Sequence, residues 1–267
     1  MQPMVNIALR AARLAAEQIA RATERLDLIK SEQASVATYI NDLCHQAERT
    51  FAHNLQKAYP HHTVTGDYSG RYEASGEGPT PCDWHITPID SLANFSNALP
   101  AFALTLVGRV KGKVTHALIL NPITGEEFTA SRGEGAQFNG KRLRVSGLKG
   151  LEGALVATGF LGRSSDRSGL DNQLSMMREL VSSGATPFNT GSVSLNLAYT
   201  AAGRVDGFFQ LGLNDTEQDA GLLMLQEAGG LVGDTSGGSN HRESGKLVAG
   251  NPKMLKALLK AMHPAIS

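Results

Sequence analysis

The chain carries the stretch Trp84-His85-Ile86-Thr87-Pro88-Ile89-Asp90-Ser91-Leu92-Ala93-Asn94-Phe95, in which an apolar run leads to an aspartate. The residues from Trp84 to Ile86 predict a short strand, because aromatic and β-branched side chains suit a pleated, half-buried surface. A Gly-rich and Pro-containing segment, residues 70–81, precedes this strand and predicts a loop. Asp90 follows the strand, and the ends of regular elements are where functional side chains are often placed.

Outward from this stretch, the hydrophobic pattern predicts helices first, then strands, then an alternation of both. Apolar residues at helical spacing predict helices over 4–26 and 40–58, the second ending before Pro60. Alternating runs and turn signals predict an antiparallel meander over 102–138. Beyond residue 150, strands are expected at 155–158, 205–211 and 247–249, and helices at 170–181, 192–202, 217–228 and from Pro252. The sequence predicts a mixed α/β (α+β) protein.

Two halves are expected to form one integrated domain of catalytic type. Residues 1–150 would hold a helix pair and an antiparallel sheet, and residues 151–267 an α/β half.

The composition excludes several classes of protein. Lys and Arg together number 25, as do Asp and Glu, so the formal net charge is zero. A generic polyanion binder is excluded, because such binding needs a strong excess of positive charge. No apolar run is long enough to cross a membrane, and the N-terminus lacks a signal-peptide core. Cys44 and Cys82 are too few for a disulfide framework, so we expect a cytoplasmic protein.

One part of the chain nevertheless has a local excess of positive charge. Between residues 109 and 149, only three Glu residues accompany eight basic residues, namely Arg109, Lys111, Lys113, Arg132, Lys141, Arg142, Arg144 and Lys149. The simpler interpretation is that these are solvated hairpin residues that protect a sheet edge. The alternative is a docking surface for an acidic protein or RNA.

Three acidic sites stand at predicted element ends, the first of them after a short strand predicted at 62–65. They are Asp67, Asp90, and the group Asp215, Glu217 and Asp219 at the start of a helix. Carboxylates that converge on one cleft suit Mg²⁺, which takes oxygen ligands. The competing interpretation of the last group is a capping box of Thr216 and Asp219, with acidic residues that favour the helix dipole.

The stretch 84–95 resembles the W-[VI]-[VI]-D-P-[LI]-D-G-T-x-N-F signature of the inositol monophosphatase family. Further matches extend the resemblance over nearly the whole chain; they are residues 189–192, 202–209, 226–230 and 249–252. The opening residues 4–8 and 10–13 look most like the SuhB-like branch of the family. The resemblance implies a layered αβαβα sandwich of the inositol monophosphatase and sugar phosphatase type, commonly a homodimer. It also implies Mg²⁺-dependent hydrolysis of a phosphate monoester, and for the SuhB-like branch a role in transcription antitermination through a Nus-type factor.

Family metal ligands map onto this chain with several changes. The first metal-binding Glu falls on Asp67, and the Asp that bridges two metals falls on the neutral Thr87. Asp90 keeps the second Asp of the signature, and Ile89 keeps a backbone carbonyl that can bind a metal. A later metal-binding Asp becomes Glu217 or is displaced to Asp219, an alternative that the residues leave open.

Catalytic and substrate positions of the family also differ here. The Thr that orients the attacking water falls on Leu92, after Ser91, and its upstream Asp partner aligns on Thr38. Positioned proton transfer contributes about 10²–10⁴-fold to a rate, so this loss bears on activity. The substrate-binding positions fall on Ser91, Gly191, Ser192, Val193 and Gln210.

These changes favour a pseudoenzyme with weak or no phosphatase activity and a binding role. Two divalent cations about 4 Å apart repel by about 17 kcal/mol at an effective dielectric constant near 20, so a two-metal site depends on its bridging carboxylate. We expect at most one weakly held Mg²⁺, between Asp90 and Glu217. The rival hypothesis is an active Mg²⁺-dependent inositol or sugar phosphate phosphatase with an altered substrate preference.

Overall fold

The computed structural model describes residues 3–26, 36–159 and 167–265. The chain divides into two compact units, Met1–Glu134 and Gly135–Ser267. This division precedes residue 150 because the hairpin of β7 (Gly135–Phe138) and β8 (Lys141–Arg142) packs against α7 (Asp215–Glu227). The Gly135 amide donates a hydrogen bond to Glu227 Oε2 at 2.8 Å, which anchors the start of the hairpin.

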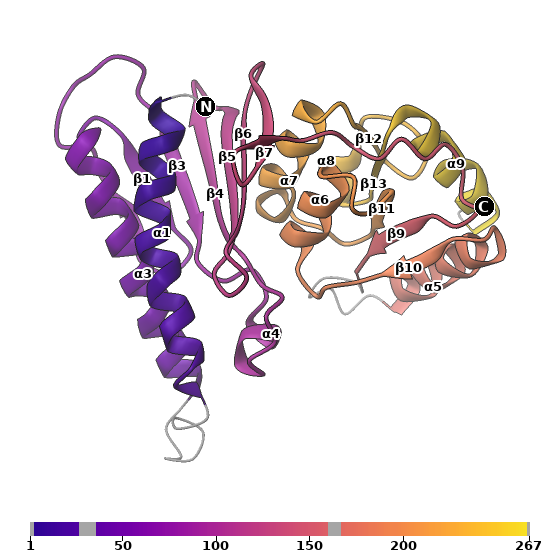
Figure 1. Ribbon diagram of the computed structural model, residues 1–267, viewed down its shortest axis with the longest axis horizontal. Coiled ribbons are helices and arrows are strands. Elements are labelled where there is room, and N and C mark those ends of the chain that lie inside the picture. Colours follow the sequence, from indigo (N-terminus) through magenta and orange to yellow (C-terminus); the bar gives the residue numbers. More distant parts are fainter. Residues whose placement is uncertain (1–2, 27–35, 160–166, 266–267) are drawn as a thin grey trace. The chain divides into compact units, whose positions relative to one another are not determined.

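Two long helices, α1 (Pro3–Thr23) and α3 (Val36–Ala58), pack side by side and contact the sheet of the first unit (Figure 1). Their buried residues recur every third or fourth position, as the apolar periodicity predicts. In α3 these include Ile40, Leu43, Ala47, Phe51 and Leu55.

The strands of the first unit are hydrogen-bonded in the order β2-β1-β3-β4-β5-β6. Their bounds are β1 (Thr63–Gly66), β2 (Gly70–Tyr72), β3 (Asp83–Thr87), β4 (Leu104–Val110), β5 (Lys113–Asn121) and β6 (Glu126–Ser131). From β4 to β6 the neighbours are antiparallel, in agreement with the predicted meander. β1 and β3 are parallel, so the segment that follows β1 is carried to the same sheet edge as the end of β3.

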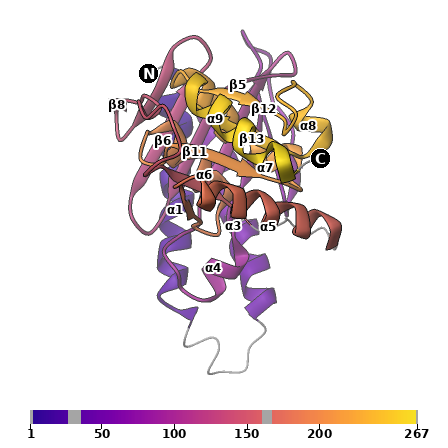
Figure 2. The same cartoon turned by 90° about the vertical axis from the view of Figure 1, so that its right-hand side faces the viewer.

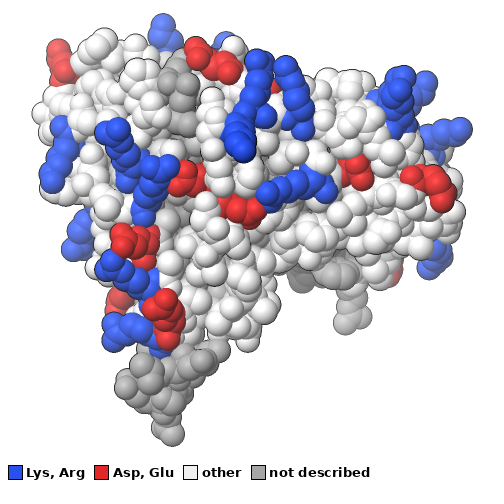
Figure 3. Space-filling view, viewed as in Figure 1, with Lys and Arg blue, Asp and Glu red and all other residues white. Residues whose placement is uncertain are grey.

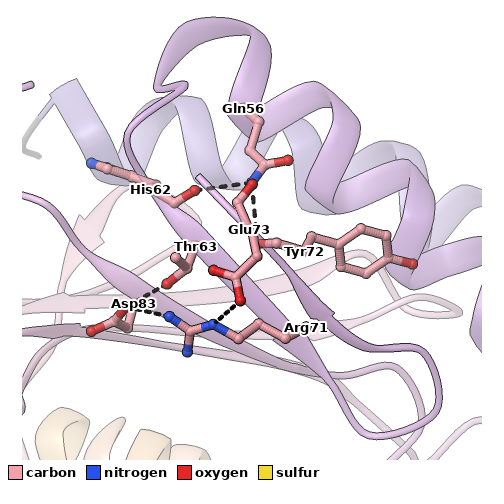
Figure 4. A network of polar contacts seen from close by, with 7 residues as sticks. All are labelled: Gln56, His62, Thr63, Arg71, Tyr72, Glu73 and Asp83. Carbon is pink, nitrogen blue, oxygen red and sulfur yellow. Dashed lines mark hydrogen bonds and ion pairs between the residues drawn. The ribbon is translucent and has the colours of Figure 1, made fainter. Parts of the chain in front are cut away.

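A network of polar contacts secures the short edge strand β2 (Figure 4). Gln56 on α3 donates from Nε2 to the carbonyl oxygens of His62 and Glu73, both at 3.0 Å. Arg71 Nε lies 2.9 Å from Glu73 Oε1, and its Nη2 lies 3.9 Å from Asp83 Oδ1. The first three residues of the predicted loop 70–81 therefore form a strand instead, and these contacts hold that strand to α3 and β3.

In the second unit, helices cover both faces of a five-stranded sheet of order β10-β9-β11-β13-β12. α6 (Val193–Ala201) and α7 lie on one face, and α5 (Arg167–Ser182) and α9 (Pro252–Met262) on the other (Figures 1 and 2). The strands are β9 (Leu155–Thr158), β10 (Thr186–Phe188), β11 (Gly207–Gln210), β12 (Leu231–Gly233) and β13 (Leu247–Gly250). Two short helices complete the α-helices of the described residues: α4 (Leu92–Ser96) in the first unit and α8 (His241–Ser244) in the second.

The layers within each unit confirm the predicted α/β fold class. The first unit has a helix pair on a sheet, and the second has a sheet between two helix pairs. The strand β10 was not predicted, because Pro187 at its centre lowers the strand signal. No helix among the described residues has the length and apolar character needed to cross a membrane.

Candidate functional site

Asp67 lies in the turn between β1 and β2, which we call the Asp67 loop (residues 66–69). Its Oδ1 is 2.7 Å from Nε2 of His85 on β3. The parallel register explains this contact, because Thr65 is the partner of His85 and Asp67 is two residues further along. The first candidate metal ligand therefore already contacts an imidazole nitrogen within its own unit.

Glu48 on α3 holds the Asp67 loop through two hydrogen bonds, and it was not among the residues predicted from the sequence. Its fully buried carboxylate accepts hydrogen bonds from the backbone amides of Tyr68, at 3.0 Å, and Ser69, at 2.7 Å. Gly66 leaves room for this contact, because a Cβ there would lie 2.2 Å from the carboxylate. A signal was present in the sequence, because Glu48 is a charged residue on the apolar face that also carries Cys44 and Phe51.

Two further α3 side chains face the same loop. His45 Nδ1 is 2.9 Å from Ser69 Oγ. Burial raises the pKa of the Cys44 thiol to about 12, against a hydrogen bond with Tyr68 that lowers it. Thr38, the predicted partner of the catalytic threonine position, lies exposed on the first turn of α3, about 9 Å along the helix axis from Cys44.

The end of β3 leads into the remaining predicted site residues of the first unit. Asp90 is fixed in place by Ala103, whose amide donates to Asp90 Oδ1 at 2.7 Å, while the Asp90 amide donates to the Ala103 carbonyl at 3.0 Å. Thr87 ends the strand, opposite Thr105 of β4. Of the other predicted residues, Ile89 and Ser91 are buried and Leu92 begins the five-residue helix α4.

In the second unit, the predicted substrate positions surround the start of α6. Ser192 is buried and caps this helix, because its Oγ accepts the Leu195 amide at 3.0 Å. Gly191 is exposed with φ +82°, a left-handed conformation that favours glycine, and Val193 is half-buried. The Gln210 side chain is buried close to Gly159, and its Oε1 has no hydrogen-bond partner among the described residues. The structure thus places Ser192 and Gln210 inside the second unit rather than on its surface.

The two alternatives for the later metal position, Glu217 and Asp219, make different contacts in α7. Asn214 Oδ1 accepts the Glu217 amide at 2.9 Å, and Glu217 Oε2 accepts the Asn214 amide at 3.0 Å. The predicted capping box of Thr216 and Asp219 is therefore wrong, because Asn214 and Glu217 form it instead. Glu217 is engaged in capping, which leaves Asp219 as the buried carboxylate.

Asp219 is paired with an arginine from α8. Its side chain is 3% exposed, and its Oδ1 lies 2.6 Å from Arg242 Nη2. The same guanidinium approaches Asp215 Oδ1, with Nη1 at 3.8 Å. A buried carboxylate needs such a partner, because an unpaired charge in the protein interior is strongly destabilising.

These contacts test whether the residues fit two Mg²⁺ ions. Asp67 contacts His85, Glu217 caps α7, and Asp219 is paired with Arg242. Within the described residues, no group of three or more His, Cys, Asp or Glu is arranged to hold a metal ion. Mg²⁺ needs several oxygen ligands around one point, so neither unit by itself provides a donor set for a two-ion centre.

Lys and Arg side chains lie on both units and are interspersed with acidic ones (Figure 3). In the second unit, Lys141, Arg142 and Arg144 are exposed on and just after β8. In the first unit, Lys111 and Lys113 are exposed at the β4–β5 turn. These five basic residues are thus on the surface, and they are divided between the two units.

Comparisons with known proteins agree with this fold. The profile described as "Inositol monophosphatase family" matches residues 1–267. The chain is 48% identical over 264 residues to "Nus factor SuhB" of Pseudomonas aeruginosa, covering 99% of this chain and 97% of that protein. It is 39% identical over 267 residues to "Nus factor SuhB" of Escherichia coli (strain K12), covering 100% and 98%.

Solved structures show the same architecture. The native crystal structure of the extragenic suppressor protein suhB from Bartonella henselae matches with a TM-score of 0.82 at 29% identity, covering 98% of both chains. The inositol monophosphatase from Anabaena (Nostoc) sp. PCC 7120 matches with a TM-score of 0.72 at 25% identity, covering 96% of both chains. The chain therefore belongs to the inositol monophosphatase family.

Proposed function

We propose that this SuhB-like protein is a binding component of the transcription machinery whose degenerate metal site supports weak or no phosphatase activity. The names of the relatives, Nus factor SuhB at 39–48% identity over the full length, support the transcription role. One observation carries the loss of activity: the buried carboxylate of Asp219 is already paired with Arg242. Thr87, a neutral residue where the family signature has Asp, supports the same conclusion.

Without the bridging carboxylate, two Mg²⁺ ions would lack the ligand that most offsets their mutual repulsion. At most one weakly held Mg²⁺ is compatible with the remaining donors. Leu92 also lacks the hydroxyl that would orient a water molecule for attack. Metal binding and water positioning are therefore weakened together.

We expect no Mg²⁺-stimulated hydrolysis of myo-inositol 1-phosphate or of a panel of sugar phosphates. Release of inorganic phosphate would be measured with and without Mg²⁺, beside an active inositol monophosphatase as the positive control. Turnover that requires Mg²⁺ and disappears in Asp90→Asn would instead establish the rival function, a phosphatase with an altered substrate preference.

The transcription role predicts capture of a Nus-type protein factor or of RNA through the exposed residues Lys141, Arg142 and Arg144. Reversing all three charges to Glu should abolish most retention on the immobilised protein, because these contacts are electrostatic. A matched control reverses three exposed lysines on α9, namely Lys253, Lys256 and Lys260. If the parent protein retains neither partner, or if both triple variants behave like the parent, the binding role fails.

We also propose that the protein is a homodimer that uses an exposed apolar stripe of α5. Leu170, Leu174 and Val181 recur at helical spacing on one face of α5 and are exposed, while Met176 and Leu180 on the adjacent face are buried. The stripe supports the proposed interface, because contiguous exposed apolar patches are typical of interaction sites. Light scattering should show a dimer for the parent and a monomer for Leu174→Glu, whereas the exposed control Asn172→Glu should stay dimeric. A monomeric parent would contradict this proposal.

A further inference from the structure

Arg242 occupies a fixed position relative to Asp219. The loop before α8 is fastened by Asp234, whose Oδ1 accepts the amides of Ser236, at 2.8 Å, and Gly238, at 2.9 Å. Its Oδ2 accepts the amide of Asn240, at 3.1 Å, directly at the start of α8. The Ser236 hydroxyl also donates to Asp234 Oδ1. Four hydrogen bonds thus hold the loop to this one carboxylate.

The other end of α8 is held as well. Gly245 ends the helix in the left-handed conformation, with φ +63°. Its carbonyl accepts the amide of Leu213 at 3.0 Å, just before the capping residue of α7. Both ends of α8 are therefore held by hydrogen bonds within the second unit, and Arg242 of this helix contacts Asp219 of α7.

The burial of the two partners differs in an informative way. The Asp219 side chain is 3% exposed, whereas that of Arg242 is 44% exposed. Asp219 is shielded from water, so a nearby cation stabilises its charge, and guanidinium stays charged at every physiological pH. The Arg242 guanidinium is partly exposed, so its desolvation on pairing with Asp219 costs little free energy.

We propose that Arg242 is the built-in cation of Asp219 and blocks this carboxylate from binding a divalent metal ion. This inference deepens the proposed function, because it gives a physical cause for the degenerate metal site. A divalent ion that approached Asp219 would meet the positive charge of Arg242 and a carboxylate oxygen already in contact at 2.6 Å. Asp215 also forms an ion pair with this guanidinium, with its Oδ1 3.8 Å from Arg242 Nη1.

Mn²⁺ binding to the full chain tests this, measured by electron paramagnetic resonance of the free ion. Arg242→Gln should bind Mn²⁺ at least about tenfold more tightly than the parent, a difference of about 1.4 kcal/mol. Arg242→Lys, which keeps the charge, should not gain affinity. Arg71→Gln is the matched control, because it also removes an arginine from two carboxylates, on the surface of the first unit.

The gain in Mn²⁺ affinity should vanish in the double variant Arg242→Gln/Asp219→Asn, which lacks the buried carboxylate. Equal Mn²⁺ affinity of the parent and Arg242→Gln, or a gain that survives Asp219→Asn, would overturn the inference.

Thermal unfolding provides a second readout. Arg242→Gln should lower the Tm by on the order of 5 °C, and the double variant should recover most of it, because the buried charge is then gone. An unchanged Tm in Arg242→Gln would also overturn the inference. Retention of the Nus-type factor or RNA by Arg242→Gln is a separate assay, so failure of the binding role is distinguished from failure of this charge pairing.

Discussion

Glu48→Ala is expected to lower the free energy of unfolding of the first unit by about 3 kcal/mol. The substitution removes the acceptor of two backbone amides, those of Tyr68 and Ser69, and a hydrogen bond to a charged group contributes about 1.5–3 kcal/mol. It also leaves a cavity at a fully buried position. Urea unfolding followed by tryptophan fluorescence measures the effect, because Trp84 is the single tryptophan and lies buried in the first unit.

Gly66→Ala is a second way to disturb the same contact. The added Cβ would lie 2.2 Å from the Glu48 carboxylate, so either the helix or the loop must move. Gly147→Ala is its control, because no atom lies within 4 Å of the added Cβ there. Equal stability of Glu48→Ala and the parent would show that Glu48 does not support the Asp67 loop.

Acid is expected to destabilise the first unit by about 3 kcal/mol through His62 alone. His62 is fully buried, and its Nδ1 accepts the Trp84 indole N–H at 3.2 Å. Burial, followed by the nearby His61, lowers the pKa of His62 to about 4 from 6.5. A difference of one pKa unit corresponds to about 1.4 kcal/mol, which gives the stated magnitude.

The sign follows from proton binding. Between pH 6.5 and about 4 the unfolded chain binds a proton at His62 that the folded chain does not, so stability falls as the pH falls through this window. Above pH 6.5 the contribution is fully present, and below pH 4 no further loss comes from this group. Burial also lowers the pKa of His116, whose ring stacks on Trp84, which adds a loss of the same sign.

Unfolding curves at pH 7.5, 6.5, 5.5 and 4.5 test this. His62→Asn keeps an acceptor but cannot titrate, so its stability should vary less with pH than that of the parent. His53→Asn, at an exposed position of α3, should keep the parent's dependence. The prediction fails if His62→Asn and the parent lose the same stability between pH 6.5 and 4.5.

Local patterns were sufficient for most of the fold. The helices α1, α3, α7 and α9 and the strands of the meander follow from apolar periodicity and turn residues, because these depend on neighbours within a few positions. The strand β10 was not predicted because a proline lies at its centre, and α4 was not predicted because five residues carry little periodic signal.

The sequence by itself determined which carboxylates stand at element ends and that a neutral Thr87 replaces a charged family residue. These carboxylates are Asp67, Asp90 and the group Asp215, Glu217 and Asp219. Only the tertiary structure decided what each carboxylate contacts. Glu48 meets Tyr68, 20 positions away, and Asp67 meets His85, 18 positions away. Strand register and helix packing set these pairings, and both depend on contacts between distant segments that local periodicity does not encode. The partner of Asp219, Arg242 on a separate short helix, is decided in the same way.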